Sequence, residues 1–248
     1  MKLGWLAGGV LAVGLGSLGA LGAASPSERT VAEFRTSLEG RSANQRHNAW
    51  LAAKTLNGKV INPDAEFSFN QTFGGWTRDR GYRRAPVSYN GTLIDAWGGG
   101  VCQTSSTLYN TALLAGLTID ERHAHHFAPG YVAPGRDAAV AYPNIDLRFR
   151  NPYPKSLTIH AKIEGDAIVV QLRGQVKPGS LPAIRQRVVN YSAPMEVTVG
   201  QGKYGRVRAP GKPGWSIETY RIQHGRTERL SVDTYPSMPR VVEYSAPH

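Results

Sequence analysis

The chain has 248 residues, of which 41% are hydrophobic, with 28 glycines, 16 prolines and a single cysteine. This composition supports a packed core with many turns and excludes a disordered polymer, and one cysteine excludes an intrachain disulfide. The formal net charge of +11 favours an anionic wall or membrane surface as partner, whereas nucleic acid is not expected because no zinc-finger, helix-turn-helix or RNA-binding motif is present.

The N-terminal segment has the pattern of an export signal. Lys2 is followed by an uncharged stretch that runs to Ser27, and the small residues 22–24 form a candidate signal-peptidase site. The stretch is also about long enough to span a bilayer. Residues 1–24 are therefore predicted to be a signal peptide or an N-terminal membrane anchor. Either one places the rest of the chain in the cell envelope, in the periplasm or outside the cell.

A strand and a capped helix are predicted next. Residues 31–38 alternate loosely between apolar and polar, as a strand does. Residues 42–57 have helical periodicity, and Ser42 and Gln45 have the spacing of a capping box. We therefore expect this helix to begin at Ser42 and to end at the Asn-Gly pair that follows it.

The region before the cysteine favours short strands and loops. Residues 62–70 contain a turn and then a short strand that places Phe67 and Phe69 on the same side. The glycine-rich region 74–100 favours loops around a strand that turns at Asn90–Gly91.

A helix over 103–115 and a strand over 117–127 are predicted after the cysteine. On an extended strand His123 and His125 point to the same side, and His126 points to the other. Two further strands follow, joined by the turn EGDA. The composition then changes, so we expect a linker at 177–186 and a small all-β domain at 187–248.

The single cysteine lies between three glycines and the predicted helix, in the stretch WGGGVCQTSS. Free N–H groups and the helix dipole at a helix N-terminus stabilise a thiolate and lower the pKa of a cysteine. A backbone without side chains also lets a substrate approach, and its amides can bind an oxyanion. The alternative is a buried, inert cysteine. The candidate oxyanion and substrate loop comprises Gly98, Gly99, Gly100, Val101 and Gln103.

A thiol nucleophile usually needs a base, and His123 and His125 are the candidates for Cys102. The first alternative is that these histidines are only polar surface. The second is a metal site made of the cysteine and both histidines, but a fourth ligand is not evident, so no metal or other cofactor is expected.

Three further residues are candidates for binding substrate. Trp97 flanks the glycines and could line a groove, although such tryptophans more often pack in a core. Arg136 and Asp137 lie in a predicted turn, where they either bind a substrate or pair with each other.

Several motifs in order resemble the VanW-like family: NQRHNAWLAAKTLNGKVINPDAEFSFN, GGGVCQTSSTLYNTALLAGL, ERHAHH and YVAPGRDAAVAY. This is a bacterial cell-envelope family named from glycopeptide-resistance gene clusters, and some members look like a separate class of L,D-transpeptidase. The resemblance implies that Cys102 is the nucleophile. It also implies an α+β fold in which a mixed VanW-like domain, residues 30–176, packs a few helices on an antiparallel sheet.

The tail is similar to the G-five domain, an extracellular β-module, which implies a role in wall retention. Deletion after Gln175 is accordingly expected to weaken retention but to spare reaction with a soluble peptide. The predicted function is that of an exported, monomeric cysteine acyltransferase, an L,D-transpeptidase acting on peptidoglycan stem peptides. The alternatives are a non-catalytic peptidoglycan-binding protein of the vancomycin-resistance type and a metal-binding envelope protein.

Overall fold

The computed structural model describes residues 28–89, 92–176 and 181–245. The predicted signal peptide or anchor at 1–24 and the predicted turn at Asn90–Gly91 lie outside the described residues. Within the described part of the chain, no helix is both long and apolar enough to cross a membrane. Strands dominate and three helices accompany them, so the described chain is β-rich and compatible with an α+β fold.

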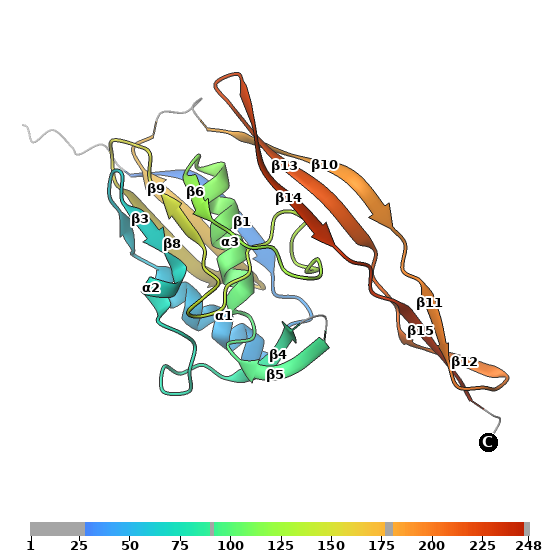
Figure 1. Cartoon of the computed structure of the whole chain (residues 1–248). Helices are drawn as coiled ribbons and strands as arrows, with labels where there is room; N and C mark the ends of the chain where they lie inside the picture. The colour runs from blue at the N-terminus through green and yellow to red at the C-terminus, as the bar shows by residue number, and fades with distance from the viewer. Residues whose placement is uncertain (1–27, 90–91, 177–180, 246–248) are drawn as a thin grey trace, which may run out of the picture.

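A four-stranded antiparallel sheet forms the base of residues 28–176, which we call the body (Figure 1). Side chains alternate along its strands, so that Leu157, Ile159 and Ala161 are buried on one face. The strand order is β1 (Arg29–Ser37), β9 (Ala167–Gly174), β8 (Leu157–Glu164) and β2 (Val60–Ile61).

Helices α1 (Ala43–Leu56) and α3 (Val101–Leu114) lie side by side against this sheet (Figure 1). The capping box predicted for α1 is confirmed. Ser42 Oγ accepts from the Gln45 amide at 3.2 Å, and Gln45 Oε1 accepts from the Ser42 amide at 3.1 Å. The predicted apolar stripe of α1 is buried against the sheet and α3.

Helix α3 is buried nearly all round, including its polar residues. Ser105 Oγ donates to the Ala138 carbonyl at 2.6 Å, and Asn110 Nδ2 donates to the Arg136 carbonyl at 2.6 Å. Buried hydroxyl and amide groups need such partners. The polar face of α3 therefore fixes the loop at 134–141, which carries part of the site described below.

Small sheets complete the body, and one prediction is corrected here. Phe69 does not continue the predicted strand but begins a short helix, because Ser68 caps it by accepting from the Gln71 amide at 3.0 Å. The strands on either side of residues 90–91 pair antiparallel. The elements are β3 (Glu66–Ser68), α2 (Phe69–Phe73), β4 (Arg84–Tyr89), β5 (Thr92–Trp97), β6 (Thr118–Glu121) and β7 (Arg148–Arg150).

The strand predicted over 117–127 ends early, since β6 stops at Glu121. Beyond this point the chain leaves the sheet because its polar groups bind the loop at 134–141 instead of a neighbouring strand. Arg122 Nε donates to the Asp137 carbonyl at 2.6 Å, and the His125 amide donates to Asp137 Oδ2 at 2.7 Å. The two-residue alternation assumed for His123 and His125 is therefore wrong.

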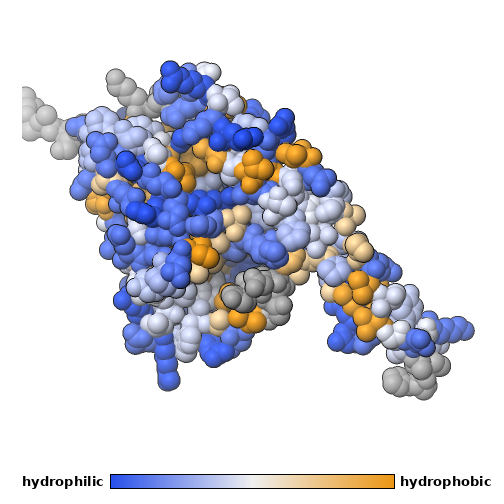
Figure 2. All heavy atoms as spheres, viewed as in Figure 1, coloured by the Kyte–Doolittle hydropathy of each residue, from blue (hydrophilic) through white to orange (hydrophobic). Residues whose placement is uncertain are grey.

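Residues 181–245, which we call the extension, contain only strands in the described part of the chain. They form two three-stranded sheets, and Figure 1 shows them running past α3 to a far tip at the C-terminus. Figure 2 shows apolar residues gathered toward this far end, where Val197, Val199 and Val207 are exposed. The sheets are β10 (Ala183–Ser192), β13 (Gly214–Gln223) and β14 (Arg226–Tyr235), then β11 (Glu196–Val199), β15 (Arg240–Ser245) and β12 (Tyr204–Ala209).

Candidate active site

A cleft of about 330 Å³ opens beside the N-terminus of α3, and Cys102 lies in its lining. The other lining residues come from the turn before α1 and its first turn, from β4, from the start of α3 with the glycine loop before it, from the chain after β6 and from the extension. Cys102 is the second residue of α3 and is partly exposed, and its Sγ lies 3.4 Å from the Val140 carbonyl oxygen. The cysteine is thus both anchored and open to a ligand.

The glycines before Cys102 are required by the fold itself. Gly98 and Gly100 have φ values of 81° and 108°, a conformation that side chains disfavour. A Cβ on Gly98 would lie 2.3 Å from Trp76 Cδ1, and a Cβ on Gly100 would lie 2.4 Å from the Gln45 carbonyl oxygen. The glycines let the chain pass between Trp76 and α1, a reason that the sequence prediction of substrate access did not include.

Only some backbone amides of the predicted oxyanion loop are free to bind a ligand. The Gly98 amide donates to the Arg83 carbonyl at 3.3 Å, and the Val101 amide donates to the Gly98 carbonyl at 2.9 Å. Val101 is also buried in the core. The prediction is therefore narrowed to the Gly99, Gly100 and Cys102 amides, for which the described residues supply no backbone acceptor.

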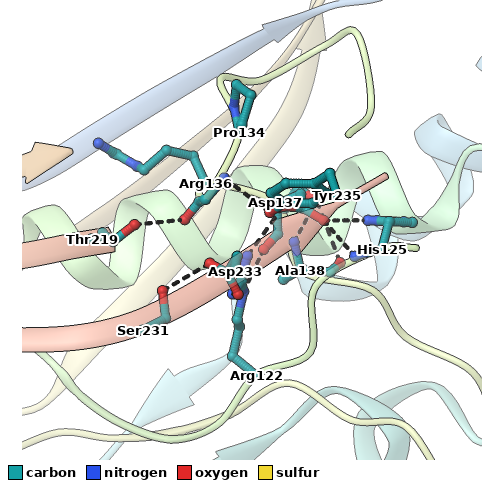
Figure 3. Close-up of polar contacts among 12 residues, drawn as sticks. Arg122, His125, Pro134, Arg136, Asp137, Ala138, Thr219, Ser231, Asp233 and Tyr235 are labelled. Atoms are coloured by element: carbon teal, nitrogen blue, oxygen red, sulfur yellow. Dashed lines mark hydrogen bonds and ion pairs between the residues drawn. The ribbon is translucent and has the colours of Figure 1, made fainter. Parts of the chain in front are cut away.

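His125 contacts Asp137 (Figure 3) and also interacts with the Cys102 side chain. His125 Nδ1 lies 2.6 Å from Asp137 Oδ2, and the same oxygen accepts from the His125 amide at 2.7 Å. With Nδ1 occupied by the carboxylate, Nε2 is the nitrogen left for its interaction with Cys102. Cys102, His125 and Asp137 therefore have the arrangement of a nucleophile, a base and the group that orients the base.

The electrostatics of this triad favour a charged pair. Burial alone would lower the pKa of His125, but Asp137 and Cys102 outweigh it and raise the pKa to about 10. Burial would raise the pKa of Cys102, but the interaction with His125 outweighs it, so the pKa is lowered. Both shifts favour a thiolate beside an imidazolium, which is the reactive form of a cysteine.

Asp137 is fully buried, and two residues besides His125 hold it (Figure 3). Arg122 Nη2 donates to Oδ1 at 3.1 Å, and the Tyr235 hydroxyl donates to the same oxygen at 2.5 Å. Arg122 also pairs with Asp233 at 2.5 Å. Burial would raise the pKa of Asp137, but the hydrogen bond from His125 and the charge of Arg122 outweigh it and lower the pKa. The carboxylate therefore stays ionised.

The other histidines of the cluster lie outside the cleft lining. His123 is exposed, and its Nε2 lies 2.9 Å from Glu121 Oε1. His126 is exposed and packs edge-on against Phe127. Of the two candidate bases, only His125 lies in the cleft with Cys102, so His123 is no longer a candidate. The alternative metal site of Cys102, His123 and His125 does not form either. Among the described residues, no three His, Cys, Asp or Glu side chains come together in a way that could hold a metal.

The remaining predicted substrate residues have other roles. Asp137 does not face substrate and does not pair with Arg136, whose Nε donates to Asn110 Oδ1 instead. Trp97 is 39% exposed on β5 but does not line the cleft. Gln103 lines the cleft, but its side chain is buried and joins α3 to β1, because its Nε2 donates to the Ser37 carbonyl at 2.7 Å.

Four contributors to the site were not predicted from the sequence. Arg122 is adjacent to the predicted histidines, and its place in the motif ERHAHH was the one available signal. Asp233 and Tyr235 belong to the extension, about a hundred positions after the residues that they contact, Arg122 and Asp137. No local sequence pattern indicates these contacts. Arg41, which donates to Gln103 at 2.9 Å, lies in the turn before α1.

The comparisons with known proteins agree with this description of the body. The family model described as "VanW like protein" matches residues 44–173, just over half of the chain. The chain is 39% identical over 146 residues to the uncharacterized protein YoaR of Bacillus subtilis, covering 59% of this chain and 48% of that protein. It is 32% identical over 154 residues to the vancomycin B-type resistance protein VanW of Enterococcus faecalis, covering 60% and 56%. The chain thus spans about half the length of these curated relatives.

One solved structure is also similar, the crystal structure of HP0197-G5. It covers 26% of this chain and 97% of its own, with 16% identity and a TM-score of 0.16. A likeness this low carries no argument, so the G-five character of the extension stays a prediction.

Proposed function

The chain belongs to the VanW-like family, and from this premise we propose that it is an exported cysteine acyltransferase that acts on peptidoglycan stem peptides. The observation that carries the proposal is that Cys102 and His125 line the same cleft and interact, while His125 Nδ1 is held by the buried Asp137. The predicted export signal supports the location, and the similarity to a vancomycin B-type resistance protein of Enterococcus supports the substrate class.

In the first half-reaction the Cys102 thiolate attacks the carbonyl carbon of a stem-peptide amide. The amides of Gly99, Gly100 and Cys102 are the groups placed to bind the oxyanion that forms. The carbon–nitrogen bond then breaks, the leaving amine takes the proton from His125 Nε2, and a thioester remains on the sulfur.

The ion pair explains how His125 can give up this proton. Part of its raised pKa comes from the negative charge on Cys102. Once the sulfur is acylated that charge is gone, so the imidazolium becomes a stronger acid when the amine needs a proton. The Asp137 carboxylate keeps the ring oriented throughout.

In the second half-reaction an amine or water attacks the thioester, and His125 Nε2 accepts the proton of the incoming group. The carbon–sulfur bond breaks and the thiolate is restored. An amine gives a cross-link between two stems, whereas water gives a trimmed stem.

The experiment is intact-protein mass spectrometry after incubation with purified muropeptides. We expect a mass increase that maps to Cys102, equal to the donor stem minus the leaving residue. Cys102→Ala should remove the adduct, and the matched control His123→Ala should retain it because His123 lies outside the cleft lining. Absence of any adduct, together with sacculus binding that survives Cys102→Ala, would favour the non-catalytic wall-binding alternative.

A further inference from the structure

The cleft beside Cys102 has positive charge that no carboxylate balances. Its lining includes Arg41, Lys212 and His125, and contains no Asp or Glu. His125 is paired with the buried carboxylate of Asp137, which lies outside the lining, so the charges of the arginine and the lysine remain. A ligand that places an anion in this cleft would therefore be favoured.

Arg41 is held in place by the body. Its Nε donates to Gln103 Oε1 at 2.9 Å, and its guanidinium carbon lies 5.2 Å from the centre of the Tyr131 ring. Gln103 is fixed in turn by its hydrogen bond to the Ser37 carbonyl. Among the described residues Arg41 takes part in no ion pair, so its terminal N–H groups are available to an anionic ligand.

Lys212 reaches the same cleft from the extension. Its amide donates to the Met238 carbonyl at 3.0 Å, and its carbonyl accepts from the Met238 amide at 2.9 Å. These bonds join two segments of the extension where both line the cleft. The Lys212 side chain is exposed and, within the part of the chain that the structure describes, makes no ion pair.

We propose that Arg41 and Lys212 form a carboxylate-binding subsite that holds the acyl donor against Cys102. This inference rests on the proposed function and adds a feature that the substrate must carry, a free carboxylate near the bond that is cut. An arginine fork matches the geometry of a carboxylate, and a flexible ammonium adds charge. The carboxylate can come from the C-terminus of the leaving residue or from a side branch of the residue that donates the acyl group.

Binding measurements test the subsite without chemistry, using the full-length Cys102→Ala protein. Four synthetic stem peptides are titrated by calorimetry: one with both carboxylates free, two with one or the other amidated, and one with both amidated. We expect amidation of the recognised carboxylate to weaken binding at least about tenfold, as for a charge-assisted hydrogen bond. The position at which amidation matters identifies the source, and equal affinity for all four peptides would overturn the proposal.

Substitutions then assign the effect to the two cations. Arg41→Gln and Lys212→Gln should each reduce the preference for the free carboxylate, and the double variant should abolish it. Arg35→Gln is the matched control, because Arg35 lies outside the cleft lining and pairs with Glu33 at 2.9 Å. A preference that persists in the double variant would contradict the subsite.

The outcomes separate this inference from the proposed function. If the carboxylate preference is found but no thioester forms on the wild-type protein, the subsite stands and acyl transfer fails. If iodoacetamide still alkylates Cys102 in the wild-type protein while no thioester forms, the thiol is accessible and reactive and only acyl transfer fails.

The contacts behind Asp137 support a second, independent inference. Tyr235 is 1% exposed, and its hydroxyl accepts from the Gly135 amide at 2.9 Å and donates to Asp137 Oδ1 at 2.5 Å (Figure 3). We infer that Tyr235 is a positioning residue: it fixes Asp137 and, through it, the orientation of His125. The extension therefore contributes to the geometry of the site through this residue.

Tyr235→Phe tests this role because it removes only the hydroxyl and keeps the ring in the core. We expect Cys102 alkylation at pH 6 to slow about tenfold, as when the partner of an orienting group is lost. We also expect the proton resonance of His125 Nδ1–H to shift. Tyr220→Phe is the control, since the Tyr220 hydroxyl binds Glu218 on the extension. An unchanged alkylation rate and resonance in Tyr235→Phe would overturn the inference.

Discussion

The body and the extension bury their side chains very differently. In the body, α3 is buried along almost its whole length, whereas nearly every residue of β10, β11 and β12 is exposed. The extension buries residues mainly where β13 and β14 pass the loop that carries Asp137, and there Thr219, Asp233 and Tyr235 are buried. The best-packed part of the extension is thus the part that meets the site, which a mere wall-retention tail would not require.

The largest effect should come from the body, at the nucleophile. Cys102→Ser should abolish adduct formation, because a hydroxyl beside the same histidine is a far weaker nucleophile. The free energy of unfolding should change by less than about 1 kcal/mol because Cys102 is only partly buried. Mass spectrometry and thermal unfolding provide the two measurements. A destabilisation of several kcal/mol would instead show that the sulfur is a core residue.

A paired substitution compares the two regions directly. Asp137→Asn, in the body, should lower the acylation rate by about a hundredfold to ten-thousandfold, because His125 loses its orienting charge. Asp233→Asn, in the extension, should lower the acylation rate less, since Arg122 still contacts Asp137. Single-turnover acylation rates give the comparison. A larger loss for Asp233→Asn would mean that the extension dominates the orientation of His125.

Substitutions in the body should reduce the free energy of unfolding more than substitutions in the extension, because the side chains of the body are more deeply buried. Leu108→Ala removes a fully buried side chain of α3 and should lower the free energy of unfolding by about 2–5 kcal/mol. Val188→Ala removes a side chain that is 55% exposed on β10 and should change it by less than about 0.5 kcal/mol. Denaturant titration checks both, and similar losses for the two variants would contradict the contrast in packing.

The pH dependence of Cys102 alkylation sharpens the electrostatic part of the comparison. The pKa of His125 is raised to about 10 and that of Cys102 is lowered, so we expect the thiolate to persist as the pH falls from 8 to 6. Alkylation should slow little over this range, whereas a free thiol slows about tenfold per pH unit below its pKa. His125→Ala should restore the steep dependence of a free thiol. A wild-type profile as steep as that of the variant would rule out the ion pair.

The smallest effect is expected at the histidine outside the cleft. His123→Ala removes an exposed contact with Glu121 that is worth less than about 1 kcal/mol. Its adduct yield and alkylation profile should match those of the wild-type protein. A strong loss of adduct yield in His123→Ala, without loss of stability, would show that His123 and not His125 is the base.

Local patterns were sufficient for some of this molecule. The capping box of α1, the paired strands around the Asn-Gly region, and a helix that begins beside Cys102 all follow from interactions within a few residues. The family resemblance is confirmed by the match over residues 44–173. What a short segment does by itself, or with its immediate neighbours, can therefore be predicted from the order of its residues.

The tertiary structure alone decided which polar groups meet. The sequence favoured a strand that would make His123 and His125 equivalent, but the contacts of Arg122 and His125 with Asp137 break that alternation. The sequence placed Asp137 in a turn, where it would bind substrate or pair with Arg136, yet it is fully buried and held by His125 and by Tyr235 of the extension. Such contacts join positions up to a hundred residues apart, and their strength comes from burial, which only the packed molecule defines.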